Sequence, residues 1–371
     1  MVAKRVEDIG LSGIREIFEI SKDAINLGIG EPYVDTPKEI IDGIKEIMHR
    51  HTHYTPSLGY QELREMISEK LRRENGIDAD EDEVIVTCGA SEALGISLLS
   101  LVERGEEVLV PDPCFVSYSS LSKLCEARIK HMPTKIDDDF RVSPEVAEEM
   151  VSKKTRIIIL NTPNNPTGAV MSKEDVKAFA DIATDYNIYI LSDEVYEKII
   201  YGGKHYSVGR YTEKAITVNG FSKSYAMTGW RVGYLHARKE LINEFLKIHQ
   251  YFNACAPSIS QIAAIIALKT CNSFVKKMVE GYRERRDIAY ESLKDNFICN
   301  KPDGAFYMMV KKDGFEKDRD IAIDLIKRGV AVVPGSVFGK CGKGYFRISY
   351  STSLENLKKG LSIINKYFGG V

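Results

Sequence analysis

One short segment of the chain combines a lysine and an arginine with several turn-forming residues. Residues 219–234 read NGFSKSYAMTGWRVGY, which contains Lys223 and Arg231. A lysine amine forms imines with carbonyl compounds, and an arginine guanidinium binds phosphate or carboxylate through two parallel hydrogen bonds. Because the residues between them favour a turn, both side chains can point inward. The segment therefore predicts a site that holds a carbonyl group and an anion of one ligand.

Other polar segments follow short apolar runs that predict β-strands. The runs are residues 84–87, 107–110, 156–160, 188–194 and 215–218. The segments at their ends are CGASEALG, PDPCFVSY, NTPNNPTG, SDEVY and the segment with Lys223. In an open parallel sheet, ligands bind at the carboxyl ends of the strands, so we expect these segments to lie together.

A single cofactor, pyridoxal 5'-phosphate, could use all of these segments. It needs an amine for its aldehyde, a carboxylate for its pyridine nitrogen, donors to its phenolic oxygen and a flat partner for its ring. Lys223 would supply the amine and Asp193 the carboxylate. Tyr196 and Asn165 would donate to the phenolic oxygen, and Phe115 would stack on the ring.

The cofactor's phosphate needs an anion site of its own. The backbone amides of Ala90 and Ser91, at a predicted helix start, would provide it together with the guanidinium of Arg231. Each feature alone also fits an ordinary structural role, such as a capped helix start, a solvated carboxylate or an exposed lysine. Their combination is what favours a cofactor site.

The motifs NNPTG, SDEVY and SKSYAMTGWRVGY, in this order, resemble those of the class I and II aminotransferases. These are fold type I pyridoxal phosphate enzymes of the aspartate aminotransferase superfamily. The resemblance extends over nearly the whole chain, from LGIGEP at Leu27 to YFRISYS near the C-terminus.

The resemblance implies roles for further residues. The backbone of Gly30 would contact the substrate carboxylate, and Arg347 would clamp the substrate α-carboxylate, with Asn165 also at the substrate site. Tyr54 would reach the phosphate of the cofactor in the neighbouring subunit. The resemblance thus implies a homodimer with shared active sites.

Two positions depart from the pattern of the family. Some members place a hydroxyl residue three positions before the lysine, where this chain has Gly220. Ser222 is the neighbouring hydroxyl that could replace it at the phosphate. Certain bacterial members that are specific for aspartate carry a lysine at the position of Ser91, so a strict preference for aspartate is not implied.

The implied activity is transfer of an amino group from an L-amino acid to a 2-oxo acid. The donor would be aspartate or an aromatic or broader range of amino acids, with LL-diaminopimelate as a substrate variant. The acceptor would be 2-oxoglutarate, in a ping-pong mechanism. Lys223 would act as general base and then as general acid.

Three other functions fit parts of the sequence. A β-lyase or an amino-acid decarboxylase can share this fold and most of these residues. The segment VIVTCGASEALG also resembles the nucleophile elbow of an α/β-hydrolase with Ser91 as nucleophile, but that fold needs a late histidine and the last one here is His249. A cofactor-binding regulator would need a DNA-binding module, and no basic N-terminal extension is present to supply one.

The alternation of strands and helices predicts an α/β fold in two domains. A large domain, residues 41–260, would contain a mostly parallel sheet covered by helices on both faces. A small α+β domain, residues 261–371, would be joined by an N-terminal arm, residues 1–40. The pattern also predicts one amphipathic helix within residues 1–21, and helices at 174–186, 272–295 and 258–268, the last with a serine cap.

Composition limits the setting of the protein. The 371 residues carry a formal net charge of −2, so no overall field attracts nucleic acid or an anionic membrane. The longest apolar run is far short of the ~20 residues that a membrane span needs. Seven cysteines without a Cys-x-x-Cys pair argue against a disulfide framework or a zinc knuckle. We expect a cytoplasmic protein without a metal.

Overall fold

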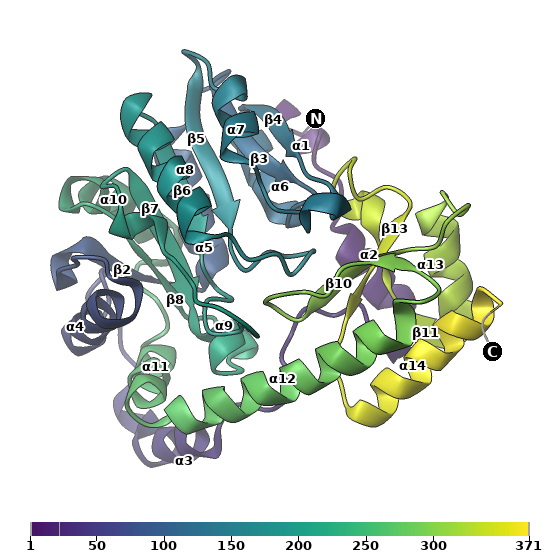
Figure 1. Cartoon of the computed structure of the whole chain (residues 1–371). Coiled ribbons are helices and arrows are strands. Elements are labelled where there is room, and N and C mark those ends of the chain that lie inside the picture. Colours follow the sequence, from purple (N-terminus) through teal and green to yellow (C-terminus); the bar gives the residue numbers. More distant parts are fainter. Residues whose placement is uncertain (1, 22, 370–371) are drawn as a thin grey trace.

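A seven-stranded sheet forms the larger part of the computed structural model, which describes residues 2–21 and 23–369 (Figure 1). The strand order is β2-β8-β7-β6-β5-β3-β4. Strand β8 runs antiparallel to both of its neighbours, and all other pairs are parallel. The strands are β2 (Val84–Thr87), β3 (Glu107–Asp112), β4 (Arg128–Pro133), β5 (Thr155–Asn161), β6 (Tyr189–Asp193), β7 (Ala215–Gly220) and β8 (Gly233–His236). The predicted mostly parallel sheet is confirmed.

Helices cover both faces of this sheet because its central strands are apolar on both sides. In β5, Ile157 and Ile159 pack on one face with the apolar residues of α5, α6 and α10. Ile158 and Leu160 face the other way and pack on α7 and α8. The helices are α5 (Ala90–Leu101), α6 (Val116–Leu124), α7 (Pro144–Met150), α8 (Lys173–Asp185) and α10 (Lys239–Asn253).

A third group of helices covers the β2 end of the sheet. Val84 and Val86 pack there with residues of α3, α4 and α11. These helices are α3 (Lys38–Ile47), α4 (Gln61–Lys70) and α11 (Ser258–Thr270).

A four-stranded antiparallel sheet of order β12-β13-β10-β9 lies in the C-terminal third. The long helix α12 leads to it from α11 (Figure 1). The elements are α12 (Asn272–Leu293), β9 (Ile298–Cys299), β10 (Tyr307–Lys311), α13 (Asp318–Lys327), β12 (Val333–Pro334), β13 (Tyr345–Ser349) and α14 (Leu354–Tyr367). The N-terminal segment joins this part, because β1 (Ile25–Asn26) pairs with β11 (Val330–Ala331). The domain limits at residues 40 and 260 stay predictions.

Two local predictions are wrong. The N-terminal segment forms two short helices, α1 (Lys4–Glu7) and α2 (Gly13–Ile20), instead of one. Leu11 between them is 99% exposed, so no apolar face continues through the break at Gly10. Helix α11 also lacks its serine cap, because the Ser258 hydroxyl donates to the His51 carbonyl oxygen at 2.7 Å instead of accepting from a helix amide.

Among the described residues, no single helix is long and apolar enough to span a membrane. Only together are helices α11 and α12 long and apolar enough, and the chain bends by 82° between them.

The carboxyl ends of β5, β6 and β7 meet at one edge of the larger sheet, which is where the chain turns into its polar segments. The last residue of β6 is Asp193, and β7 leads directly into the short helix α9 (Phe221–Ser224) that carries Lys223. Strand β8 presses closely on the start of α5 at the same edge. A Cβ atom on Gly233 would lie 2.7 Å from the Ala90 backbone nitrogen.

This close approach gives a first prediction. Gly233→Ala should destabilise the protein by about 1–3 kcal/mol, because the new methyl group meets backbone atoms that no side-chain rotation can move. Urea unfolding would measure the change. Gly202→Ala is the matched control, since a Cβ there has no neighbour within 4 Å. Equal stability of the two variants would contradict the close packing of β8 on α5.

Candidate active site

A cavity of about 1240 Å³ opens at this edge, between the two sheets. Its walls include most residues that the sequence assigned to a site. They are Gly30, Ala90, Ser91, Phe115, Asn165, Asp193, Tyr196, Ser222, Lys223, Arg231 and Arg347. The structure thus brings together residues from opposite ends of the chain.

The amine of Lys223 is the nucleophile that the cavity offers. Its Nζ donates to the carbonyl oxygen of Gly30 at 2.6 Å. Burial lowers the pKa of Lys223 to about 8, although the negative charges of Glu31 and Asp193 act in the opposite direction. A larger share of this amine is therefore neutral near pH 7–8 than in an exposed lysine, as a nucleophile or general base requires.

Asp193 is a buried carboxylate at the end of β6. The Tyr118 hydroxyl donates to its Oδ2 at 2.7 Å, and the Val195 amide donates to its Oδ1 at 3.3 Å. Burial raises the pKa of Asp193 to about 6, although the hydrogen bond from Tyr118 lowers it. Asp193 is thus ionised above this pH and suited to hold a protonated ring nitrogen. Sequence reasoning missed Tyr118, whose only signal was its position in PDPCFVSY, one helical turn after Phe115.

Two tyrosine hydroxyls meet on another wall of the cavity. The hydroxyl oxygens of Tyr196 and Tyr307 lie 2.8 Å apart, and Lys223 Nζ lies 5.9 Å from the centre of the Tyr196 ring. The sequence singled out Tyr196 but missed Tyr307. Tyr307 lies in β10, whose run AFYMMVK gave no signal beyond that of an apolar strand.

Arg347 lies 1% exposed in the centre of β13. Its Nη1 donates to Asn165 Oδ1 at 2.8 Å, its Nη2 donates to the carbonyl oxygen of Gly28, and its Nε has no partner among the described residues. The guanidinium carbon also lies 4.3 Å from the centre of the Tyr307 ring. Because none of these partners is a carboxylate, the buried positive charge is suited to an anionic ligand.

The start of α5 and Arg231 form a second anion site in the cavity. Gly89 is the N-cap residue at a φ of 81°, and Ala90 and Ser91 follow with the free amides of the first helical turn. Arg231 Nη1 donates to the Thr228 carbonyl oxygen at 3.0 Å, and a Cβ on Gly89 would lie 2.7 Å from Arg231 Nη2. Helix amides beside an exposed guanidinium fit a phosphate group.

The position of the missing hydroxyl lies close to this anion site. A Cβ on Gly220 would lie 3.9 Å from the Ala90 amide nitrogen. Ser222 lines the same cavity and is the hydroxyl that remains there. Its role at the phosphate stays a prediction.

Tyr54 does not line the cavity. Its side chain is 88% exposed, and the loop that carries it is fixed to α11 by a bond of 2.9 Å from Gln261 Nε2 to Thr55 Oγ1. Its predicted contact with the cofactor of a neighbouring subunit therefore needs a second chain and stays a prediction.

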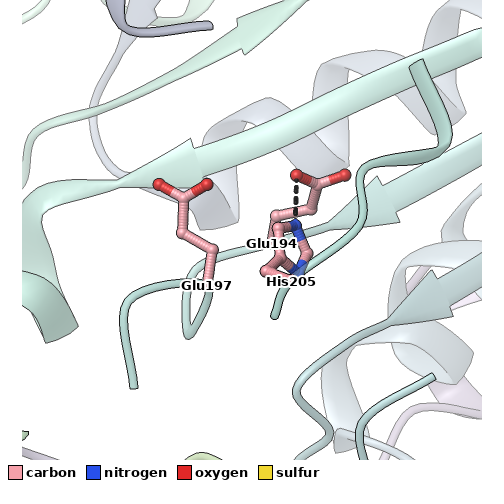
Figure 2. A group of neighbouring side chains, drawn as sticks. All are labelled: Glu194, Glu197 and His205. Carbon is pink, nitrogen blue, oxygen red and sulfur yellow. Dashed lines mark hydrogen bonds and ion pairs between the residues drawn. The ribbon is translucent and has the colours of Figure 1, made fainter. Parts of the chain in front are cut away.

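Three polar side chains, which follow Asp193 in the sequence, lie close together (Figure 2). Glu194, Glu197 and His205 have potential ligand atoms within 4.8 Å of one another, which is close enough for a metal ion. However, the ammonium group of Lys70 already contacts Glu197 and donates to Asn75 Oδ1 at 2.8 Å. We therefore interpret the cluster as a buried ion-pair network.

The hydrolase alternative finds no support in the surroundings of Ser91. Both ring nitrogens of His249 are engaged elsewhere, with Glu92 Oε1 at 2.7 Å and with the Ser57 carbonyl oxygen at 2.9 Å. Among the described residues, no hydrogen bond joins Ser91 to a histidine. The serine therefore lacks the base that a hydrolase nucleophile needs.

Comparison with known proteins gives a consistent result along the whole chain. The family model of aminotransferase class I and II matches residues 22–364. A probable aspartate aminotransferase of Methanocaldococcus jannaschii is 48% identical, over 99% of this chain and 100% of the relative. An aspartate aminotransferase of Pyrococcus horikoshii is 44% identical, over 100% of this chain and 97% of the relative. Aromatic-amino-acid aminotransferase 2 of Thermococcus litoralis is 39% identical, over 98% and 97%.

A solved structure agrees with these relatives. A single mutant of Thermus thermophilus aspartate aminotransferase superposes with a TM-score of 0.95 at 34% sequence identity, and the match covers 99% of both chains.

The lowered pKa of Lys223 predicts how its reactivity depends on pH. Only the neutral amine reacts with aldehydes, so reductive methylation of Lys223 by formaldehyde should be half-maximal near pH 8 in the cofactor-free protein. Below that pH the rate should fall about tenfold per unit. Mass spectrometry of the Lys223 peptide would measure this profile.

Asp193→Asn provides the control for this measurement. The variant removes a negative charge that raises the pKa of Lys223, so the midpoint should move to lower pH. A midpoint at about 10.4, the pKa of an unperturbed lysine, would contradict the account.

Proposed function

Because the chain belongs to the aminotransferase class I and II family, we propose that it transfers the amino group of L-aspartate or an aromatic L-amino acid to 2-oxoglutarate, with pyridoxal 5'-phosphate as cofactor. The protein is an aminotransferase. The donor is proposed from the names of the relatives, which are aspartate aminotransferases at 48% and 44% identity and an aromatic-amino-acid aminotransferase at 39%.

One observation carries the proposal, namely that Lys223, Asp193 and Arg347 line one cavity with a phosphate-type anion site. These groups fit the cofactor and an amino acid together. Lys223 would bind the aldehyde carbon, Asp193 would pair with the pyridine nitrogen, and Ala90, Ser91 and Arg231 would hold the phosphate. Phe115 would lie against the ring, and Tyr196 and Asn165 would donate to the phenolic oxygen.

The cofactor, when bound, supplies an aldehyde for the substrate amine and an electron-withdrawing ring that acidifies the bond between the α-carbon and its hydrogen. Asp193 would increase this effect by keeping a proton on the ring nitrogen. Lys223 Nζ would take the α-proton as a general base and, as a general acid, would deliver it to the carbon of the former aldehyde group, which its lowered pKa permits near neutral pH.

Arg347 would orient the substrate. Its guanidinium is fixed by Asn165 and Gly28, so it can receive an α-carboxylate without a change of rotamer. The unpartnered Nε leaves a donor available at this site. Binding of the α-carboxylate at Arg347 would place the α-carbon within reach of Lys223.

We also propose that the enzyme works as a homodimer. The support is Tyr54, which is 88% exposed on a loop that hydrogen bonds fix to the body of the chain. In a dimer its hydroxyl would complete the phosphate site of the partner subunit. We also propose that the protein is located in the cytoplasm, on the basis of its composition alone.

A half-reaction screen tests the proposed function. The protein loaded with pyridoxal 5'-phosphate is mixed with single L-amino acids, and chromatography measures pyridoxamine phosphate and the 2-oxo acid. We expect one equivalent of each from aspartate or from an aromatic amino acid, and return of the starting form upon addition of 2-oxoglutarate. Release of ammonia with pyruvate, or of carbon dioxide, would instead indicate a lyase or a decarboxylase.

Arg347→Ala is the informative variant in this screen. Loss of the carboxylate clamp should raise the amino-acid concentration that gives half-maximal rate by about 100-fold, since a charged hydrogen-bonded pair contributes about 2–3 kcal/mol. An unchanged concentration dependence would exclude Arg347 as the clamp.

A further inference from the structure

A histidine without a role in the proposed reaction contacts the first turn of α5, next to the proposed phosphate site. His249 of α10 is completely buried. Its Nδ1 lies 2.7 Å from Glu92 Oε1, and its Nε2 lies 2.9 Å from the carbonyl oxygen of Ser57. Glu92 belongs to the first turn of α5, directly after Ala90 and Ser91, which line the cavity.

The partners of His249 determine how many protons the pair carries. A carbonyl oxygen only accepts hydrogen bonds, so Nε2 must carry a proton towards Ser57. A second proton must lie between Nδ1 and Glu92, because a bare nitrogen and a carboxylate would repel each other at 2.7 Å. The pair therefore has no net charge. Burial would raise the pKa of Glu92, but the hydrogen bonds from His249 and from the Cys88 amide hold it below its ordinary value. Because the other oxygen of Glu92 accepts from the Cys88 amide, the geometry places the negative charge on Glu92 and the second proton on Nδ1 of His249.

The charge of Glu92 matters because of its place in the helix. The second oxygen of Glu92 accepts from the Cys88 amide, so the carboxylate fixes the turn from Cys88 to Ala90 that begins α5. A negative charge at a helix start stabilises the helix but opposes a phosphate at the same end. Without a positive charge beside it, Glu92 would still fix the start of α5, but its negative charge would lower the affinity of this anion site for phosphate.

We propose that His249 is a positioning residue for the cofactor phosphate, which it serves by neutralising Glu92 while Glu92 fixes the start of α5. The inference rests on the proposed binding of pyridoxal 5'-phosphate at that helix start. The same imidazolium also holds Ser57 in the loop of Tyr54. One buried cation thus connects the anion site of this chain to the loop proposed to serve the partner subunit.

The charge balance can be tested by a pair of substitutions. His249→Gln keeps a donor for one partner but leaves Glu92 charged, and the dissociation constant of pyridoxal 5'-phosphate should rise about tenfold. His249→Gln combined with Glu92→Gln removes both charges, and the constant should return to within about threefold of the original value. Absorbance titration of the cofactor-free protein measures each constant, and pyridoxal without phosphate should show a much smaller change.

A matched control exists at the opposite edge of the sheet. His236 is also buried and lies 3.7 Å from Glu83, at the end of β8 opposite to Gly233, which packs on Ala90. His236→Gln should therefore leave the dissociation constant of pyridoxal 5'-phosphate unchanged. Equal affinity of His249→Gln and the original protein, or a failure of Glu92→Gln to restore affinity, would overturn the proposal. If the original protein itself bound no pyridoxal 5'-phosphate, the proposed function would fail instead.

A second measurement does not depend on the stability of His249→Gln. Nitrogen-15 NMR of labelled histidine should show both ring nitrogens of His249 protonated, as its two contacts require. In Glu92→Gln the new amide can donate to Nδ1, so that nitrogen should lose its proton. A His249 that is neutral in the original protein would overturn the proposal.

Discussion

Charged groups held away from water in one cavity are the constraint on which the rest of the structure depends. Asp193 and Arg347 are almost fully buried, and Lys223 is partly buried. None of the three forms a direct contact with an opposite charge among the residues that the structure describes. Burial of incompletely paired charges costs several kcal/mol per ion unless a ligand compensates for it. The opposite pKa shifts of Lys223 and Asp193 express that cost.

The fold sustains this arrangement by placing the cavity between two sheets. Arg347 on β13 reaches across to Asn165, which follows β5. A second connection lies nearby, where Asp112 at the end of β3 accepts from the amides of Lys340 and Cys341 at 3.1 and 3.0 Å. Both contacts use a residue at or just after the carboxyl end of a parallel strand. The edge of the large sheet that contacts the C-terminal part is therefore also the edge that lines the proposed substrate site.

The sequence predicts the parts of this account that depend on local pattern. Apolar runs located the main parallel strands, and the polar segments after them located Lys223, Asp193 and Asn165. The sequence did not identify Tyr118 and Tyr307, because their hydrogen bonds form only when distant elements pack together. In the sequence, a tyrosine of the core and a tyrosine of the site have the same pattern. The ion pair of Glu92 with His249 likewise depends on tertiary packing of α5 and α10, which the sequence pattern does not show.

The central claim is that the Lys223 amine is the group that binds the aldehyde of the cofactor. Borohydride reduction of the protein loaded with pyridoxal 5'-phosphate, followed by peptide mapping, tests it most directly. The account predicts one pyridoxyl group per chain, on Lys223. Modification of another lysine, or no stable modification at all, would contradict it.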